Sequence, residues 1–330
     1  MMNLKNLKGL NGSLHLNLSR EKIPTRNGYG DALVELGKTN KKVVVLCADL
    51  AESIKVHQFR EKFPERFVEV GVAEQNLVAA ASGMAAVGKI PFASSYAIFC
   101  PGRCWEQIRT TICYNNQNVK LAGAHAGISV GPDGSTHQSL EDIAIMRALP
   151  NMVVVAPADY EQTKKATKAF AEYQGPAYLR FAREKTEQIT TINTPFKIGE
   201  AQIWKDGEGL ALIGAGPVVC ECLAAAELLQ KKGINAMVIN CHTIKPLDKK
   251  TILAAAKKCQ KIITVEEAQV IGGLGGAIAE YLSGVYPTKI KMLGMNDRYG
   301  ESGTPEELLK KYGFTAEHIA QEAVEMLKET

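Results

Sequence analysis

The chain has 330 residues, of which 46% are hydrophobic and 22% are charged, and 39 basic against 35 acidic residues leave a net charge of +4. Such a small surplus gives no reason to expect a nucleic acid or a membrane surface as partner, and the composition excludes a disordered or collagen-like chain. At about 150 residues per domain, the length predicts two domains.

Short apolar runs alternate with helical patterns through the first half of the chain. Buried strands are predicted at residues 43–48, 92–95, 120–124, 152–156 and 177–181, and helices at 28–37, 74–87, 105–114, 140–149 and 160–173. The strand segments are apolar throughout instead of alternating, which is typical of strands covered on both faces. Strands that alternate with helices predict a parallel α/β sheet.

A second series follows a polar, threonine-rich stretch at residues 184–198, whose composition predicts a linker. Its strands are predicted at 210–214, 236–240, 262–265 and 290–293, and its helices at 217–232, 248–258, 273–284 and 305–327, with a break near 312–315. The fold class is therefore α/β with two doubly wound domains, at residues 1–190 and 195–330.

The N-terminus and the cysteines give no sign of export. Lys, Asn and Gly interrupt the leucines of the first 22 residues, so no continuous apolar segment suits a signal peptide, and the small-residue run at 77–87 is too short to cross a bilayer. The eight cysteines form no CxxC pair and no spacing typical of zinc. We expect a reduced, cytoplasmic chain with no metal site of its own.

The residues that can carry chemistry gather in four segments, all in the first domain. Asp49 follows the strand at 43–48, with Ser53 four residues later. Ligands bind beyond the carboxyl ends of parallel strands, although Asp49 could equally be a helix N-cap. Glu74 begins a helix of mostly Ala, Gly and Ser, where small side chains would allow another chain to approach; stabilisation by the helix dipole is the alternative.

The third and fourth segments add aromatic rings and a long loop. Tyr96, Phe99 and Arg103 follow a strand, where the rings could pack in the core or form a platform for a flat heterocycle. Residues 125–138 form a loop with two histidines and an aspartate, and long structured loops are usually functional. Metal binding also suits that composition, but no further ligand stands at a typical spacing.

Taken together, GVAEQN at 71–76, YAIF at 96–99 and GPDGSTHQS at 131–139 resemble the C-terminal half of transketolase. The likeness covers about residues 20–325 and is closest to the small subunit of a split transketolase, a pyrimidine-binding domain followed by a C-terminal domain. It implies a thiamine-diphosphate-dependent transferase that moves a two-carbon ketol unit from a ketose phosphate to an aldose phosphate. Pentose phosphates are the default substrates.

The resemblance assigns the cofactor side by position. Glu74 matches the glutamate that contacts N1′ of the aminopyrimidine and promotes its imino tautomer, and Phe99 matches the ring that stacks on the pyrimidine. The other cofactor-side positions are Tyr96 and Arg103, in the same wall, and Asp49 and Leu50, at the cofactor and subunit interface.

The substrate side is assigned in the same way. Phosphate-binding positions match Arg26, Ser53, His125 and Arg183, and His125 is implied as catalytic together with Glu74. Asp133 matches an aspartate that recognises a substrate hydroxyl, and His137 is expected to hydrogen-bond the substrate. Arg180 is an alternative to Arg183, because the two lie three apart on one predicted strand and would face opposite sides.

The resemblance also implies a partner. The family holds the diphosphate and its metal through a GDG motif followed by an asparagine, and the nearest string here, Pro132-Asp133-Gly134, belongs to the substrate loop. We expect thiamine diphosphate to be shared with an N-terminal transketolase subunit that holds Mg or Ca, in a heterotetramer of two copies of each chain. Pro132 replaces an acidic residue of many full-length relatives, which we expect to be tolerated.

Three alternatives stay open. A 2-oxoacid dehydrogenase β subunit should lack the DGSTHQ loop and the phosphate-facing residues. A 1-deoxyxylulose-5-phosphate synthase-like enzyme is normally one long chain, and its donor, pyruvate, has no phosphate. A non-catalytic paralogue is disfavoured because Glu74, Phe99, His125, Asp133 and Arg183 are all intact.

Overall fold

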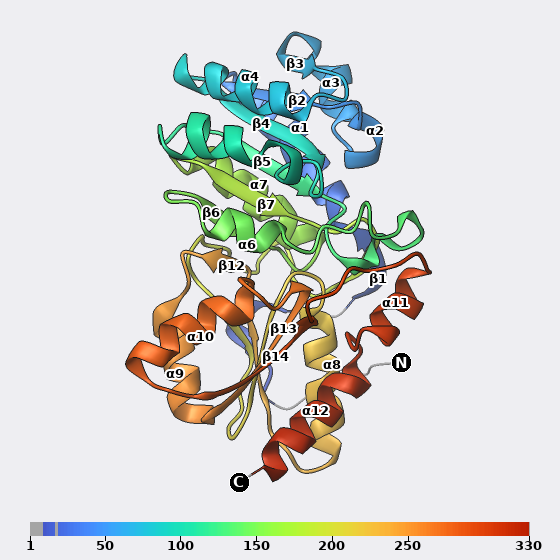
Figure 1. Cartoon of the computed structure of the whole chain (residues 1–330), viewed down its shortest axis with the longest axis vertical. Coiled ribbons are helices and arrows are strands. Elements are labelled where there is room, and N and C mark those ends of the chain that lie inside the picture. The colour runs from blue at the N-terminus through green and yellow to red at the C-terminus, as the bar shows by residue number, and fades with distance from the viewer. Residues whose placement is uncertain (1–8, 17–18, 330) are drawn as a thin grey trace.

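The first half of the chain builds six strands of a seven-stranded sheet. In the computed structural model, which describes residues 9–16 and 19–329, the spatial order is β12-β6-β7-β5-β4-β2-β3 (Figure 1). The parallel strands are β2 (Val43–Cys47), β3 (Phe67–Glu69), β4 (Ile90–Tyr96), β5 (Lys120–Ala124), β6 (Val153–Val155) and β7 (Ala177–Arg180). All five predicted strands are confirmed, and β3 is an addition.

Helices cover both faces of this sheet. One face packs on α1 (Thr25–Thr39), α2 (Ala51–Ile54), α3 (His57–Lys62) and α7 (Tyr160–Glu172), and the other on α4 (Glu74–Ala86), α6 (Asp142–Arg147) and α5 (Trp105–Gln107), which continues as a π-helix at Ile108–Cys113. Along β2, Val43 and Val45 belong to one apolar cluster and Val44 and Leu46 to the other. Burial on both faces is the reason why the strands are apolar throughout.

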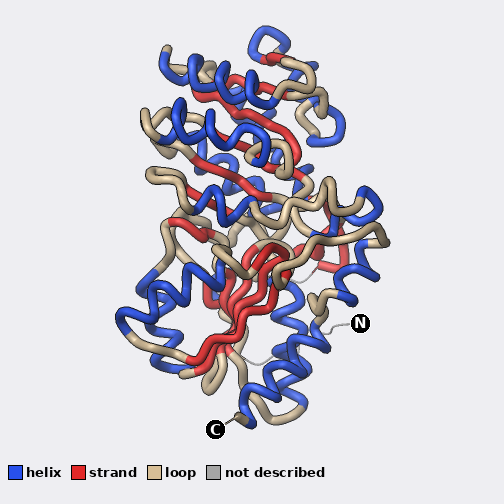
Figure 2. Tube along the Cα trace, in the orientation of Figure 1, coloured by secondary structure: helices blue, strands red, loops and turns tan. Residues whose placement is uncertain are grey.

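The second half builds a five-stranded sheet with helices on both sides (Figure 2). Its order is β14 (Lys289–Met295), β13 (Lys261–Gln269), β10 (Ala211–Ala215), β11 (Met237–Asn240) and β9 (Gln202–Lys205), of which β9 alone is antiparallel to its neighbour. One face packs on α8 (Val219–Lys231) and α12 (Ala316–Lys328), the other on α9 (Lys249–Cys259) and α10 (Leu274–Val285). The predicted break separates α11 (Pro305–Lys311) from α12, as expected.

The predicted linker is wrong in part. Its first residues form β8 (Lys185–Gln188), which pairs antiparallel with β1 (Ser19–Pro24). Thr186 and Gln188 of β8 are buried, and the β-branched threonine suits a strand even where the sequence is polar.

Each half of the chain also contributes a segment that packs on the other half. β12 (Thr243–Lys245) comes from the second half but pairs with β6 in the first sheet. At the other end, the Asn11 N–H donates to the Trp204 carbonyl at 2.9 Å, so the N-terminal residues 9–16 lie on the second domain. We propose to keep the domain division near residues 190–195, since the rest of each sheet comes from one half of the chain.

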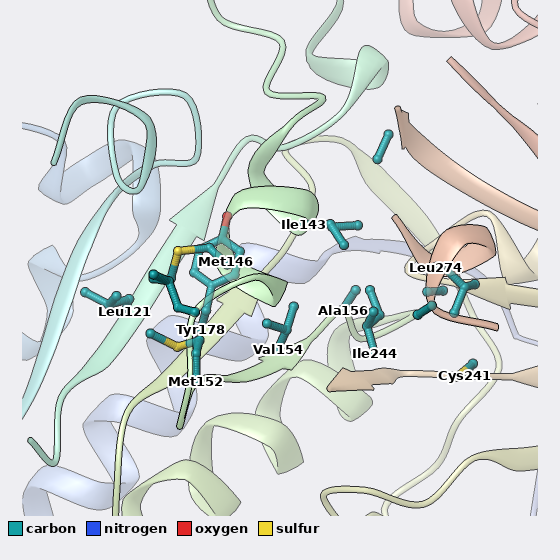
Figure 3. Close-up of a cluster of buried hydrophobic side chains, with 14 of the residues drawn as sticks. Leu121, Ile143, Met146, Met152, Val154, Ala156, Tyr178, Cys241, Ile244 and Leu274 are labelled. Atoms are coloured by element: carbon teal, nitrogen blue, oxygen red, sulfur yellow. The ribbon is translucent and has the colours of Figure 1, made fainter. Parts of the chain in front are cut away.

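One apolar cluster runs from the first sheet into the second domain. Figure 3 shows Leu121 of β5, Val154 of β6 and the preceding Met152 in the same region as Ile244 and Leu274 of the second half. A shared core of this kind holds the two domains in one arrangement. All eight cysteines are buried and free, and none of the described helices combines the length and apolar character needed to cross a membrane.

Candidate active site

Polar side chains converge at the carboxyl ends of four neighbouring strands. Ser53 follows β2, Tyr96 ends β4, His125 follows β5 and Arg183 follows β7. Because these strands are parallel neighbours, their ends lie along one edge of the sheet, where ligands of open α/β sheets bind. Arg26, in the first turn of α1, reaches the same edge and donates Nη1–H to the Ser53 carbonyl at 3.0 Å.

His125 lies at the centre of this group. It is 1% exposed and adopts a left-handed backbone conformation with φ +54°. The Tyr96 ring stacks on its imidazole, with centroids 4.0 Å apart. Nε2 of His125 is 3.2 Å from Ser53 Oγ and 3.5 Å from Arg26 Nη1, and Ser53 Oγ lies 2.7 Å from the Tyr96 hydroxyl.

The surroundings keep this histidine neutral. Burial, with the positive charges of Arg26 and Arg183, lowers the pKa of His125 to about 3. A guanidinium can only donate, so the contact with Arg26 places the lone pair on Nε2 and the proton on Nδ1. Nδ1 is buried and finds no hydrogen-bond partner among the described residues, so its N–H is an unsatisfied donor.

Glu74 and Phe99 form a second part of the site. Glu74, the first residue of α4, is 1% exposed, and its Oε2 is 3.3 Å from Arg103 Nη1. The Arg103 guanidinium also lies 5.1 Å from the centre of the half-buried Phe99 ring. Phe99 is nearly parallel to Tyr96, at 6.0 Å and 19°. The buried carboxylate and the partly exposed phenyl ring therefore contact the same guanidinium group.

The loop after β5 folds back over this aromatic wall. His137 meets the Phe99 ring edge-on at 5.5 Å. Asp133 accepts a hydrogen bond from Arg183 Nη1 at 3.0 Å, and both side chains are 32% exposed. His137 therefore joins the aromatic rings, and Asp133 and Arg183 form an ion pair in the same loop region.

The structure separates the two candidate arginines. β7 ends at Arg180, so the prediction that both lie on one strand is wrong. Arg180 is 5% exposed, and it donates to Asp142 Oδ2 at 2.9 Å and to the Glu267 carbonyl at 2.8 Å. Since Arg180 is committed to these buried partners, Arg183 is the arginine that remains accessible to a ligand.

Asp49 and Leu50 lie at the margin of the site. Leu50, not Asp49, is the residue that precedes α2, and no side chain caps that helix, so the N-cap alternative for Asp49 is wrong. Asp49 is exposed with φ +58°, and its N–H donates to Glu69 Oε1 at 2.7 Å. Among the described residues, no hydrogen bond links the Asp49 carboxylate to the other predicted site residues.

One neighbour of Glu74 went unpredicted. Ser95 Oγ lies 3.5 Å from Glu74 Oε1, and the residue is fully buried. The sequence signal was a pair of serines inside an otherwise apolar strand, because buried hydroxyls normally have a partner. No group of three or more His, Cys, Asp or Glu side chains suited to a metal ion occurs in the described ranges 9–16 and 19–329.

Both halves of the chain match known protein families. Residues 21–188 match the transketolase pyrimidine-binding domain, and residues 199–319 match the transketolase C-terminal domain. A putative transketolase C-terminal section from Methanocaldococcus jannaschii is 48% identical over 306 residues, which cover 92% of this chain and 96% of the relative. A 6-deoxy-6-sulfo-D-fructose transketolase subunit from Clostridium sp. is 38% identical, with 91% and 94% covered.

A solved structure and a longer relative also belong to the transketolases. A split-gene transketolase, described as an inactive β4 tetramer, matches with a TM-score of 0.85 and 42% identity over 93% of this chain and 99% of that chain. Human transketolase is 38% identical, but the match spans only 48% of its length. The chain is therefore similar in extent to subunits and sections, and to about half of a full-length enzyme.

Proposed function

Because the chain belongs to the transketolase family and spans its pyrimidine-binding and C-terminal domains, we propose that it works as the C-terminal subunit of a split transketolase. It takes part in moving a two-carbon ketol unit from a ketose phosphate to an aldose phosphate. The main observation behind this proposal is that Arg103 contacts both the buried Glu74 and the partly exposed Phe99 ring, near the sheet edge where Arg26, His125 and Arg183 lie.

The residues present fit one half of thiamine diphosphate. A buried carboxyl group can exchange a proton with a ring nitrogen, and a half-buried phenyl ring can stack on a flat aminopyrimidine. When bound, the cofactor supplies the nucleophilic carbon and the electron sink for ketol transfer. The residues of this chain bind and orient its pyrimidine through Glu74, Phe99, Tyr96 and Arg103, with Asp49 and Leu50 at the margin.

The other half of the site suits a phosphorylated sugar. Two guanidinium groups, Arg26 and Arg183, lie near the neutral donor His125 and the Ser53 hydroxyl, a combination that favours a tetrahedral oxyanion. Asp133 and His137 lie on the same loop near these groups and would hydrogen-bond the sugar hydroxyls. The ion pair between Asp133 and Arg183 joins partly exposed groups and is weak, so a substrate can replace it.

Replacing Arg183 with alanine is expected to raise KM for phosphorylated sugars about tenfold or more while kcat changes little, because the lost group supplies binding. Arg180→Ala is the matched control. It removes the buried partner of Asp142 and is expected to lower the free energy of unfolding by about 3–5 kcal/mol. Steady-state kinetics and urea denaturation separate the two variants, and an unchanged KM in Arg183→Ala would contradict the assignment.

An N-terminal partner subunit completes the proposed enzyme. The sequence has no motif for the diphosphate, which the partner would hold together with Mg or Ca. Val72 and Val87, which flank the two ends of α4, are 69% and 77% exposed. Between them, Ala79, Gly83 and Ala86 present a small-residue face of α4 to solvent. Such a face suits a helix of another chain. We propose a cytoplasmic heterotetramer with two copies of each chain.

The named relatives bear on the choice of substrate. Two of similar length are a 6-deoxy-6-sulfo-D-fructose transketolase subunit and an apulose-4-phosphate transketolase subunit from Phocaeicola vulgatus, the latter 35% identical. Both names describe ketol transfer with specialised sugars. Pentose phosphates are the first substrates to test, followed by sugars with a terminal sulfonate or phosphate.

The test compares this chain alone, the N-terminal subunit alone, and their mixture. We expect thiamine diphosphate binding by calorimetry and ketol transfer between pentose phosphates only in the mixture. A split-gene relative is described as an inactive tetramer of one chain, which is the behaviour expected of this chain without its partner. Tight binding of the cofactor by this chain alone would contradict the shared site.

A further inference from the structure

The loop that carries Asp133 and His137 rests on the second domain. Gln138 Nε2 donates to the Glu301 carbonyl at 2.9 Å. Gly131 lies so close to Pro305 that an added Cβ would sit 3.0 Å from the proline ring. Figure 1 shows α11 and the segment before it alongside this loop. The second domain contributes none of the predicted site residues, but it packs directly against this loop.

One side chain makes the most direct connection. Glu267, near the end of β13, is 6% exposed, and its Oε1 accepts a hydrogen bond from the Ser129 N–H. A Cβ added to Gly127 would lie 2.5 Å from the same oxygen, so the loop backbone is in close contact with the carboxylate. The Glu267 carbonyl accepts from Arg180 Nη2 at 2.8 Å, which ties this residue to the end of β7 as well.

The hydrogen bond between Glu267 and Ser129 lies in the same loop segment as Asp133. Ser129 is the second residue of the segment Ile128–Asp133, which a non-helical Gly131 (φ +79°, ψ −116°) divides into two short turns. The contact with Glu267 therefore anchors the first turn, in which the Val130 carbonyl accepts from Arg183 Nη1 at 3.2 Å. Without Glu267, the buried Ser129 N–H would lose its acceptor, which favours a rearranged loop. Arg183 Nη1 donates to both the Val130 carbonyl and Asp133 Oδ1, so a shift of the first turn disturbs the partner of Asp133.

We propose that Glu267 is a positioning residue for substrate binding, which holds the loop so that Asp133 and His137 face the site. The inference rests on the proposed function, because it assigns these two side chains to the sugar. It gives the second domain a defined part in the reaction: the carboxylate never touches the substrate but sets the place of residues that do.

The neighbouring Glu266 provides a matched control. It is 1% exposed, lies on the same strand and accepts from the Leu274 and Gly275 N–H groups at 2.6 and 2.8 Å, at the start of α10. It is a buried carboxylate like Glu267, and it accepts backbone N–H groups in the same way. Its contacts lead away from the loop, so its loss disturbs the second domain without releasing Ser129.

The experiment uses the complex with the N-terminal subunit and compares Glu267→Ala, Glu267→Gln and Glu266→Ala. For Glu267→Ala we expect KM for the ketose phosphate to rise about tenfold, with kcat changed less than about threefold. Glu267→Gln should restore KM to within about twofold, since its amide oxygen still accepts the Ser129 N–H. Glu266→Ala should lower Tm but leave KM unchanged.

A double-mutant cycle with Asp133→Ala distinguishes a specific effect through Asp133 from a general destabilisation of the fold, which would change KM equally in both backgrounds. If Glu267 acts through Asp133, Glu267→Ala should raise KM much less in the Asp133→Ala background than in the wild type. An equal rise in both backgrounds, an unchanged KM in Glu267→Ala, or the same rise in Glu266→Ala would overturn the proposal. If Glu267→Ala does not fold, Gly127→Ala disturbs the same contact from the loop side, and an unchanged KM there counts equally against it.

Failure of this inference and failure of the proposed function give different results. Absence of ketol transfer in the wild-type mixture contradicts the function itself. An active wild type whose KM does not respond to Glu267→Ala leaves the function intact and removes only the part assigned to Glu267.

Discussion

Replacing Glu74 with alanine is expected to lower kcat of the reconstituted enzyme by about 1,000-fold, because the change removes a positioned proton donor and acceptor. Glu74 is buried at the start of α4, and its contacts with Arg103 and Ser95 are long, at 3.3 and 3.5 Å. Arg103 is half exposed and can return to water. We therefore expect folding and assembly with the partner to survive, and the measurement is single-turnover ketol transfer at saturating cofactor.

The matched control for Glu74 is Glu161, which also lies in the first turn of a helix, α7, but outside the predicted site. Glu161→Ala should leave kcat within about twofold of the wild type. Size-exclusion chromatography and thermal melts show whether the Glu74 variant is assembled. Full turnover in an assembled Glu74→Ala complex would remove the proposed mechanism.

Replacing His125 with glutamine is expected to lower kcat/KM by about 100-fold, because an amide cannot reproduce the positions of the two imidazole nitrogens in this buried part of the proposed site. The imidazole contacts Ser53, Arg26 and the Tyr96 ring, and its Nδ1 has no partner among the described residues. Glutamine keeps a polar group but cannot stack in the same way on Tyr96.

The pH dependence tests the state of this histidine. Because the pKa of His125 is lowered to about 3, the imidazole stays neutral from pH 5.5 upward, and protonation begins only as the pH falls towards 3. The loss caused by His125→Gln should therefore be the same at about pH 6 and pH 8. A wild-type step near pH 6.5 that disappears in the variant would show that His125 titrates, contrary to this expectation.

His318→Gln is the control for that series. His318 lies in α12, where it is 39% exposed and 3.6 Å from Glu322. Its replacement should change neither kcat/KM nor the pH profile, which separates the effect of the site from the general effect of removing a histidine.

The site could be predicted from sequence where a residue follows directly from a local pattern. Glu74 at a helix start and Tyr96 at a strand end lie where the periodicity placed them. The assignment of Asp49 as an N-cap failed, because Leu50 precedes α2 instead and the Asp49 N–H bonds to Glu69, twenty residues away in sequence. A contact over that distance leaves no mark on local spacing.

The choice between Arg180 and Arg183 also depended on contacts that local sequence does not record. In sequence, Arg180 and Arg183 are equivalent candidates. Only the packing of β7 against α6 and β13 commits Arg180 to Asp142 and the Glu267 carbonyl and leaves Arg183 accessible. Burial with a charged partner is a property of the assembled fold, so composition and spacing could not distinguish the two.

The sequence by itself determined the class of the fold, the order of its main strands and helices, and the family to which its motifs belong. Apolar periodicity and strand-end residues are local, and a parallel sheet aligns such ends without further information. The tertiary structure alone decided that β12 joins the first sheet, that β8 occupies part of the predicted linker, and that Glu267 of the second domain accepts a hydrogen bond from the loop after β5. These features depend on contacts between segments far apart in the chain, whose free energy appears only when both sides are packed together.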